Sequence, residues 1–240
     1  MNSDKGVKIN LGCGKVFIPG FINADISPGE GVDLLVDMNN LNMLSQYEWY
    51  GKVEFVYLSH VLEHFPTVQV PSLLNDLYSL LGEGGKIRIA VPDLNKICTL
   101  YVKNIDWFVP PHNPWLGLIY GGQIDQYDFH KTGYNFHYLE WLLHQAGFSH
   151  VVEVSGSDDL GILDGSQSNL PFGNISLNIE ATKGSEMVSS KQFKYTPIEQ
   201  LLSYFADIVM KVLSVLVRVR IVLIRNRIKK SLKKIKIERR

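Results

Sequence analysis

The sequence predicts an α/β fold built on a mainly parallel sheet, and three observations favour it. Short apolar runs, typical of buried parallel strands, recur along the first half of the chain. Apolar residues at helical spacing separate two of these runs, as a parallel crossover requires. A glycine pair, Gly12 and Gly14, directly follows the first run, where an open parallel sheet receives a ligand.

The first half of the sheet is predicted from apolar runs and turn residues. The predicted strands are Val7–Leu11, Ile22–Asp25, Asp33–Asp37, Val53–Ser59 and Lys86–Val91. Between the last two, apolar spacing predicts a helix over Val68–Leu81, and Gly82, Gly84 and Gly85 are expected to end it.

Residues 93–132 break this pattern with aromatic residues, the Pro110-Pro111 pair and a weak helical signal over Leu94–Val102. We expect an insertion over the active face, because an α/β enzyme places substrate contacts there. Regular structure resumes with a helix over Phe136–Ala146, followed by strands at Val151–Val154 and Ile175–Ala181. The predicted domain therefore spans residues 1–183.

A polar linker over residues 184–197 leads to a basic tail over residues 198–240. The chain has no net charge, but residues 211–240 hold twelve Lys and Arg against one acid, so the first 210 residues are acidic. The tail has the pattern of an amphipathic helix. Its best twenty-residue window, Phe205–Ile224, contains Asp207, Lys211, Arg218 and Arg220, which disfavours a membrane span.

We expect the tail to lie on an anionic membrane surface, its apolar face inserted and its basic end near the headgroups. A dimerising or domain-capping helix is the first alternative. Nonspecific nucleic-acid binding is the second, which the acidic body disfavours. The two cysteines cannot form a disulfide framework, and the N-terminus does not resemble a signal peptide. The expected location is cytoplasmic, peripheral at the inner face of the membrane.

The glycine turn fits neither of two common nucleotide-binding motifs. The dinucleotide fingerprint needs glycine at position 17, where Phe17 stands. A P-loop ending at Lys15 needs glycine at position 9 and Ser or Thr at position 16, where Ile9 and Val16 stand. What remains is a strand, the turn, a second strand and then Asp25, placed for a ribose hydroxyl pair if the ligand is a nucleoside. Asp37, at the end of the third strand, would reach the adenine side of such a nucleoside.

Five segments together resemble the class I S-adenosylmethionine-dependent methyltransferases: NLGCG, FINADI, LSHVLEHF, LYSLLGEGGKIRIAVPDL and HKTGYNFHYLEWLLHQAGF. They resemble in particular the bacterial subgroup found among genes for surface-polysaccharide and glycan biosynthesis. The resemblance covers roughly residues 7–182. It implies a Rossmann-like fold with a seven-stranded-type sheet and helices on both faces.

The resemblance also implies S-adenosylmethionine as cofactor and assigns its contacts. Gly12, Cys13 and Gly14 would lie beside the methionine end, and Asp25 would accept the ribose hydroxyls. Asp37 and Met38 would face the adenine, with Ser59 and His60 near the methyl group. Lys15 to Ala24 is only ten residues, so the helix that usually follows the glycine turn must be shortened or absent.

The acceptor implied by the resemblance is a hydroxyl of a glycan or glycolipid intermediate in cell-envelope biosynthesis. A hydroxyl nucleophile benefits from a base whose pKa lies near neutrality, which makes histidine the first choice. The candidates are His60, His64, His130 and His137, with Asp93 and Asp128 beside them. We favour His130, in the irregular segment DFHKTGYN, followed by His60 and Asp93. Alternatively, these residues only pin the insertion to the domain through hydrogen bonds.

Two further readings compete with the methyltransferase. His60, Glu63 and His64 match H-x-x-E-H, the inverted zinc-protease signature. The first histidine directly follows a buried strand, Pro66 breaks the local helix, and no third ligand segment is evident, so we expect no metal. The other alternative is a non-catalytic nucleotide-fold module that the tail recruits to the membrane.

Overall fold

The computed structural model of the chain describes residues 6–107, 113–156, 160, 161, 164, 166, 168–170, 173–184 and 209. The chain divides into two compact units, Met1–Val188 and Ser189–Arg240, and all the elements below belong to the first. Except for Gly184 and Val209, the predicted linker and tail lie outside the described residues. Within the described part of the chain, no helix is both long enough and apolar enough to cross a membrane.

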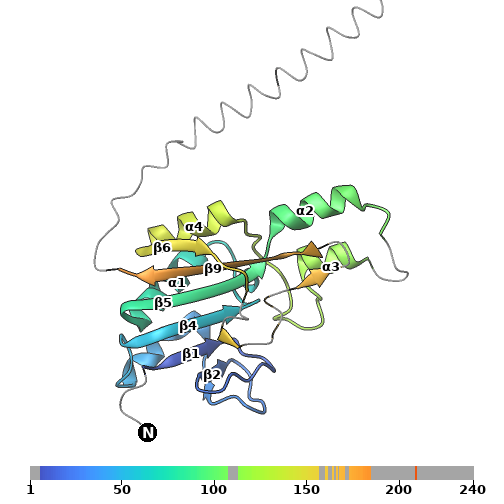
Figure 1. The fold of residues 1–240 in the computed structure, drawn as a ribbon. Coiled ribbons are helices and arrows are strands. Elements are labelled where there is room, and N and C mark those ends of the chain that lie inside the picture. The colour runs from blue at the N-terminus through green and yellow to red at the C-terminus, as the bar shows by residue number, and fades with distance from the viewer. Residues whose placement is uncertain are drawn as a thin grey trace, which may run out of the picture. The chain divides into compact units, whose positions relative to one another are not determined.

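The core of the first unit is a seven-stranded sheet with the order β3-β2-β1-β4-β5-β9-β6 (Figure 1). Strands β1 to β5 pair in parallel, whereas β9 pairs antiparallel with both β5 and β6. The strands are β1 (Lys8–Leu11), β2 (Ile22–Asp25), β3 (Leu34–Leu35), β4 (Val53–Ser59), β5 (Leu81–Pro92), β6 (Phe148–Glu153) and β9 (Ser176–Lys183). A separate ribbon pairs β7 (Asn169–Leu170) with β8 (Gly173–Asn174). The predicted mainly parallel sheet is confirmed.

The strand order reverses between β1 and β4. The chain runs outward from β1 through β2 to β3 and then returns to β4 on the other side of β1. Such a reversal opens a crevice at the carboxyl ends of the two strands, and ligands bind there in open α/β sheets. Gly12 directly follows β1 and His60 directly follows β4, so both stand at this crevice.

Four α-helices and two 3-10 helices join the described strands. The α-helices are α1 (Val70–Leu80), α2 (Leu94–Lys103), α3 (Pro114–Tyr120) and α4 (Phe136–Gln145), and the 3-10 helices are η1 (Met38–Gln46) and η2 (Leu62–His64). The sequence analysis did not predict α3. This helix starts at a proline, and the Asn113 side chain accepts a hydrogen bond from the Trp115 amide, which caps it.

The three glycines expected to end α1 lie instead inside β5, which begins at Leu81. A Cβ atom on Gly85 would lie 2.7 Å from the Val53 carbonyl oxygen and 2.8 Å from that of Gly82. The pairing of β4 with β5 also shifts register between Val53 and Phe55. Glycine therefore permits an irregular, tightly packed stretch of strand here.

The two faces of β4 pack against different parts of the chain. Val56 and Leu58 belong to the main core with buried residues of α1 and α4. On the opposite face, Phe55 and Tyr57 pack against Ile18. Residues 12–21, all of them described, form no helix. The predicted loss of the first helix is confirmed, and this loop covers the face of Phe55 and Tyr57.

Candidate active site

A cavity of about 740 Å³ opens at the crevice between β1 and β4, within the usual range for small-molecule sites. Its lining includes Gly12, Asp25, Asp37, Met38 and His60, five of the predicted cofactor residues. Of the described residues, the predicted Cys13, Gly14 and Ser59 flank these positions without lining the cavity. His64, residues 125–128 and Lys131 form another part of the wall.

The glycine turn is fixed by backbone hydrogen bonds to the second strand. The amides of Gly12 and Cys13 both donate to the Ala24 carbonyl, at 2.8 and 3.1 Å. The Gly14 amide donates to Oδ2 of Asp25 at 2.8 Å, while the Ser27 amide donates to Oδ1 at 3.0 Å. The Asp25 carboxylate therefore holds the glycine turn and the end of β2 together.

Gly12 adopts a φ of +68°, and a Cβ atom there would lie 2.5 Å from Val61 Cγ2. Both the conformation and the space require glycine. The Cys13 side chain is buried, and burial, aided by the Asp25 carboxylate, raises the pKa of the thiol from 9.0 to about 11. Cys13 therefore stays protonated near neutrality and is no nucleophile.

Asp37 caps the 3-10 helix η1 at the cavity wall. Its Oδ1 accepts hydrogen bonds from the backbone amide and the side-chain amide of Asn39, both at 2.9 Å. The carboxylate thus has a structural role as a helix cap, and it also faces the cavity.

His60 is held in an unusual conformation at the end of β4. Its φ is +54°, and it is one of three non-glycine residues with positive φ in the described part of the chain. Nδ1 lies 3.2 Å from Oε1 of Glu63, whose side chain is only 1% exposed. Because a carboxylate can only accept a hydrogen bond, the contact places the proton on Nδ1. Strained residues of this kind cluster at functional sites.

The segment 129–134 is fastened to the turn after β4 by several hydrogen bonds. The amides of Lys131 and Thr132 donate to the Glu63 carbonyl, at 2.7 and 3.1 Å. The Thr132 hydroxyl donates to the Phe65 carbonyl at 2.7 Å, and that of Tyr134 to the Leu62 carbonyl at 3.2 Å. This part of the predicted insertion is thus fixed against the active edge of the sheet.

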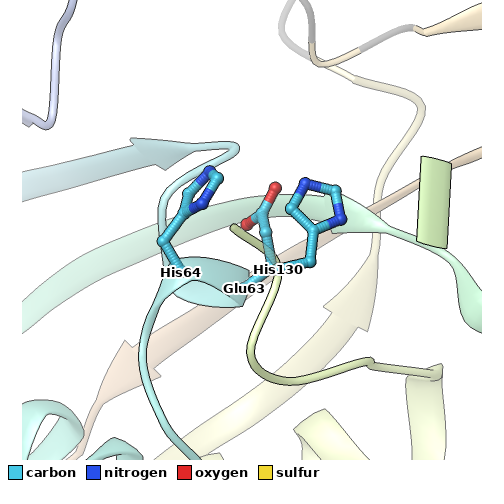
Figure 2. Close-up of side chains that lie close together, drawn as sticks. All are labelled: Glu63, His64 and His130. Atoms are coloured by element: carbon cyan, nitrogen blue, oxygen red, sulfur yellow. The ribbon is translucent and has the colours of Figure 1, made fainter. Parts of the chain in front are cut away.

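These bonds bring Glu63, His64 and His130 together (Figure 2). Each offers one ligand atom, and the three atoms lie within 4.8 Å of one another. Burial lowers the pKa of His130, although the nearby Glu63 carboxylate opposes this shift. The sequence analysis found no third ligand segment for the H-x-x-E-H motif. In the structure, His130 lies beside Glu63 and His64, whereas His60, the first histidine of the motif, is not part of this cluster.

A family model described as a methyltransferase domain matches residues 9–154 of the 240, more than half of the chain. The chain belongs to this family. It is an S-adenosylmethionine-dependent methyltransferase, as the resemblance implies. The match also decides against the metalloprotease reading of the H-x-x-E-H motif.

Solved structures with a similar arrangement include an S-adenosylmethionine-dependent methyltransferase from Archaeoglobus fulgidus, at 17% identity and a TM-score of 0.46. That alignment covers 75% of this methyltransferase and 87% of the other chain. Human N-acetylserotonin methyltransferase, solved in complex with S-adenosylmethionine, aligns at 16% identity and a TM-score of 0.42, over 75% and 48% of the two chains. A comparison with curated proteins found no match.

The residues of the methyltransferase fit its cofactor in size and in hydrogen-bonding capacity. The cavity volume suits a nucleoside-sized ligand. A carboxylate offers about four acceptor positions, and the two hydrogen bonds from Gly14 and Ser27 leave capacity on Asp25. Gly12 provides a wall without a side chain.

Asp93 has a different setting from the other predicted catalytic residues of the methyltransferase. Its Oδ1 accepts hydrogen bonds from the amides of Asn95 and Lys96, at 3.0 and 3.2 Å, and caps α2. Its other oxygen pairs with the Lys96 ammonium at 3.4 Å. Among the described residues, Asp93 is not part of the cavity lining. A catalytic role for Asp93 stays a prediction that this placement does not support.

Proposed function

We propose that the enzyme transfers a methyl group from S-adenosylmethionine to a hydroxyl of a glycan or glycolipid intermediate in cell-envelope biosynthesis. The observation that carries the hydroxyl assignment is the pairing of His60 with buried Glu63 at the cavity wall. The glycan class rests on the resemblance of the five sequence segments to the surface-polysaccharide subgroup.

The cofactor contacts proposed for the cavity follow the sequence assignment. Gly12, with Cys13 and Gly14 behind it, passes close to the methionine end, and Asp25 accepts the ribose hydroxyls. Asp37 and Met38 face the adenine, and Ser59 and His60 border the methyl group. The bound cofactor supplies an electrophilic methyl on a sulfonium, which leaves behind a neutral thioether.

His60 is the proposed general base, in preference to His130. The hydroxyl proton of the acceptor passes to Nε2, the nitrogen that the Glu63 contact leaves without a proton and that lies 3.5 Å from Oγ of Ser176. The acceptor oxygen forms its bond to the methyl carbon as the carbon–sulfur bond breaks, and that electron pair stays on sulfur. Glu63 orients the ring and stabilises the resulting imidazolium, as the carboxylate of a catalytic triad does.

Replacing His60 by alanine tests this assignment. Turnover should fall by about 10²–10⁴-fold, the usual contribution of a general base. The affinity for S-adenosylhomocysteine, measured by calorimetry, should stay close to that of the parent, because this ligand lacks the methyl group that His60 borders. Turnover at the parental rate would remove His60 as the base.

Replacing Asp25 by alanine tests the cofactor site. We expect weaker S-adenosylhomocysteine binding, because the change removes the ribose acceptor and also releases the Gly14 amide. Binding equal to the parent would contradict the assignment.

To test the acceptor class, cell-envelope extracts are incubated with enzyme and labelled methyl donor. Label confined to protein or RNA would overturn the glycan assignment.

The proposed partner of residues 198–240 is an anionic membrane surface. A glycolipid acceptor is confined to a membrane, so an enzyme concentrated there meets it more often without any change in its active site. Flotation of full-length and truncated protein with anionic and neutral liposomes tests the idea. Full-length protein that ignores anionic liposomes, or forms a dimer through the tail instead, would contradict it.

A further inference from the structure

We propose that Glu63, His64 and His130 bind one divalent transition-metal ion, zinc foremost, in the wall of the cavity. Two imidazoles and one carboxylate are the ligand set of several catalytic zinc sites. The three ligand atoms lie within 4.8 Å of one another, and Figure 2 shows the Glu63 carboxylate between the two rings. Ligands about 2.0–2.2 Å from zinc would need only a small closing movement of these side chains.

The Glu63 carboxylate provides the first independent support. Oε1 contacts His60, whereas Oε2 is buried and finds no hydrogen-bond partner among the described residues. An unsatisfied buried oxygen on a carboxylate is destabilising, and native structures keep few of them. A cation bound between Glu63 and the two rings would satisfy this oxygen.

The histidines provide the second support. Nδ1 of His64 lies 3.1 Å from the carbonyl oxygen of Phe129, so this nitrogen carries the proton and Nε2 keeps its lone pair. Metal-binding histidines almost always use their second ring nitrogen in this way, which fixes the tautomer and the orientation of the ring. The His130 ring lies beside that of His64, with 5.1 Å between the ring centroids.

A site with three protein ligands leaves coordination positions open, as catalytic zinc sites do. His64 also lines the cavity, so an open position could face an acceptor. The role that follows rests on the proposed function. The cation would hold the acceptor hydroxyl oxygen and lower its pKa, while His60, on the other oxygen of Glu63, takes the proton.

Zinc binding to the full-length chain tests the site without donor or acceptor. After removal of metals with a chelator, the protein is titrated with zinc by calorimetry and by competition with a chromophoric chelator. Exposed Cys98 could bind zinc adventitiously, so all proteins carry Cys98→Ser. We expect one zinc per chain, with an affinity lowered more than about tenfold in His64→Ala and in His130→Ala.

His137→Ala is the matched control, because His137 is an exposed histidine on α4 whose Nδ1 lies 3.8 Å from Oε2 of Glu140, and it is not one of the three clustered residues. It should bind zinc as the parent does. Glu63→Gln keeps the shape of the buried side chain and removes its charge, and it should also weaken zinc binding. Circular dichroism and S-adenosylhomocysteine affinity, measured on each variant, show that the fold is kept.

Failure of this inference is distinguishable from failure of the proposed function. A parent that binds neither zinc nor manganese nor cobalt would overturn the site, as would His64→Ala and His130→Ala proteins that bind zinc like the parent. Neither result depends on methyl transfer. Methyl transfer to a glycan at the full rate by protein stripped of metal would leave the proposed function standing and refute the catalytic role of the cation alone.

Discussion

Replacing Gly12 by alanine tests how tightly the glycine turn packs against the wall of the cavity where we propose that the cofactor binds. Gly12 has a φ of +68°, and the added Cβ would lie 2.5 Å from Val61 Cγ2 and 3.2 Å from Val61 Cγ1. Gly14 is a matched control in the same turn. Its φ is +53°, but nothing in the described part of the chain lies within 4 Å of the added Cβ.

The losses in the free energy of unfolding should differ between the two variants by the cost of packing the added methyl group against Val61. A left-handed conformation costs about 1–2 kcal/mol for a residue with a Cβ, and both variants bear this cost. Forcing a methyl group into a packed site costs about 1–3 kcal/mol more, and only Gly12→Ala bears it. We therefore expect losses of about 2–5 kcal/mol for Gly12→Ala and about 1–2 kcal/mol for Gly14→Ala.

Urea unfolding of the full-length proteins measures both losses. Combining Gly12→Ala with Val61→Ala removes the clash and leaves the strain, so the double variant should recover about 1–3 kcal/mol as coupling energy. Because Gly12 lines the cavity, its variant should also bind S-adenosylhomocysteine more weakly than Gly14→Ala. Equal losses in the two single variants, or no coupling with Val61, would refute the packing argument.

Two further predictions concern other contacts of the domain. Burial alone would raise the pKa of Glu180, but hydrogen bonds from Lys86 and Arg88 outweigh it, so the pKa lies below 4.5 in the folded chain. The stability that this pairing contributes is present above pH 4.5 and is lost as the pH falls through the lowered pKa of Glu180. Urea unfolding from about pH 6 to about pH 3 should therefore show a free energy of unfolding that depends less on pH in Glu180→Gln than in the parent. Thr132→Val removes the hydrogen bond to the Phe65 carbonyl that helps to place His130, and it should weaken zinc binding by about tenfold in the chelator competition. Undiminished zinc affinity would show that the bond does not position the site.

Much of the sheet could be predicted because apolar periodicity is a local signal. The bounds of β2 and β4 match the prediction, and the end of β1 at Leu11 placed the glycine turn correctly. The early start of β5 could not be read from Gly82 and Gly85, since glycines more often end helices. A side chain on Gly85 would meet the Val53 carbonyl, and one on Gly82 would meet the backbone of Lys52, so the need for glycine comes from contacts with a distant part of the chain.

In the candidate site, too, the residues that are close in sequence could be predicted, whereas those that meet only through the fold could not. Gly12 and Asp25 are close in sequence and in space, so one spacing argument found both. Glu63 and His64 were noticed as part of a motif, but their partner was sought along the chain. His130 reaches them through the hydrogen bonds that fasten residues 129–134 to the turn after β4, and His64 and Phe129 are 65 positions apart. The irregular, polar character of that segment was the only sequence signal.

The two oxygens of Glu63 lead to a last prediction, because each faces a different partner. Oε1 contacts His60, the proposed base, and Oε2 is left for the proposed cation. His60→Ala should lower turnover and keep zinc affinity, because Glu63, His64 and His130 all remain. His64→Ala should lower zinc affinity and raise the KM for the acceptor. Glu63→Gln should lower both turnover and zinc affinity. A glutamine amide has only one hydrogen-bond acceptor atom and carries no negative charge to attract the cation. Zinc titration and steady-state kinetics on these three proteins check the pattern. A Glu63→Gln enzyme with parental zinc affinity and a loss confined to turnover would show that Glu63 serves His60 alone.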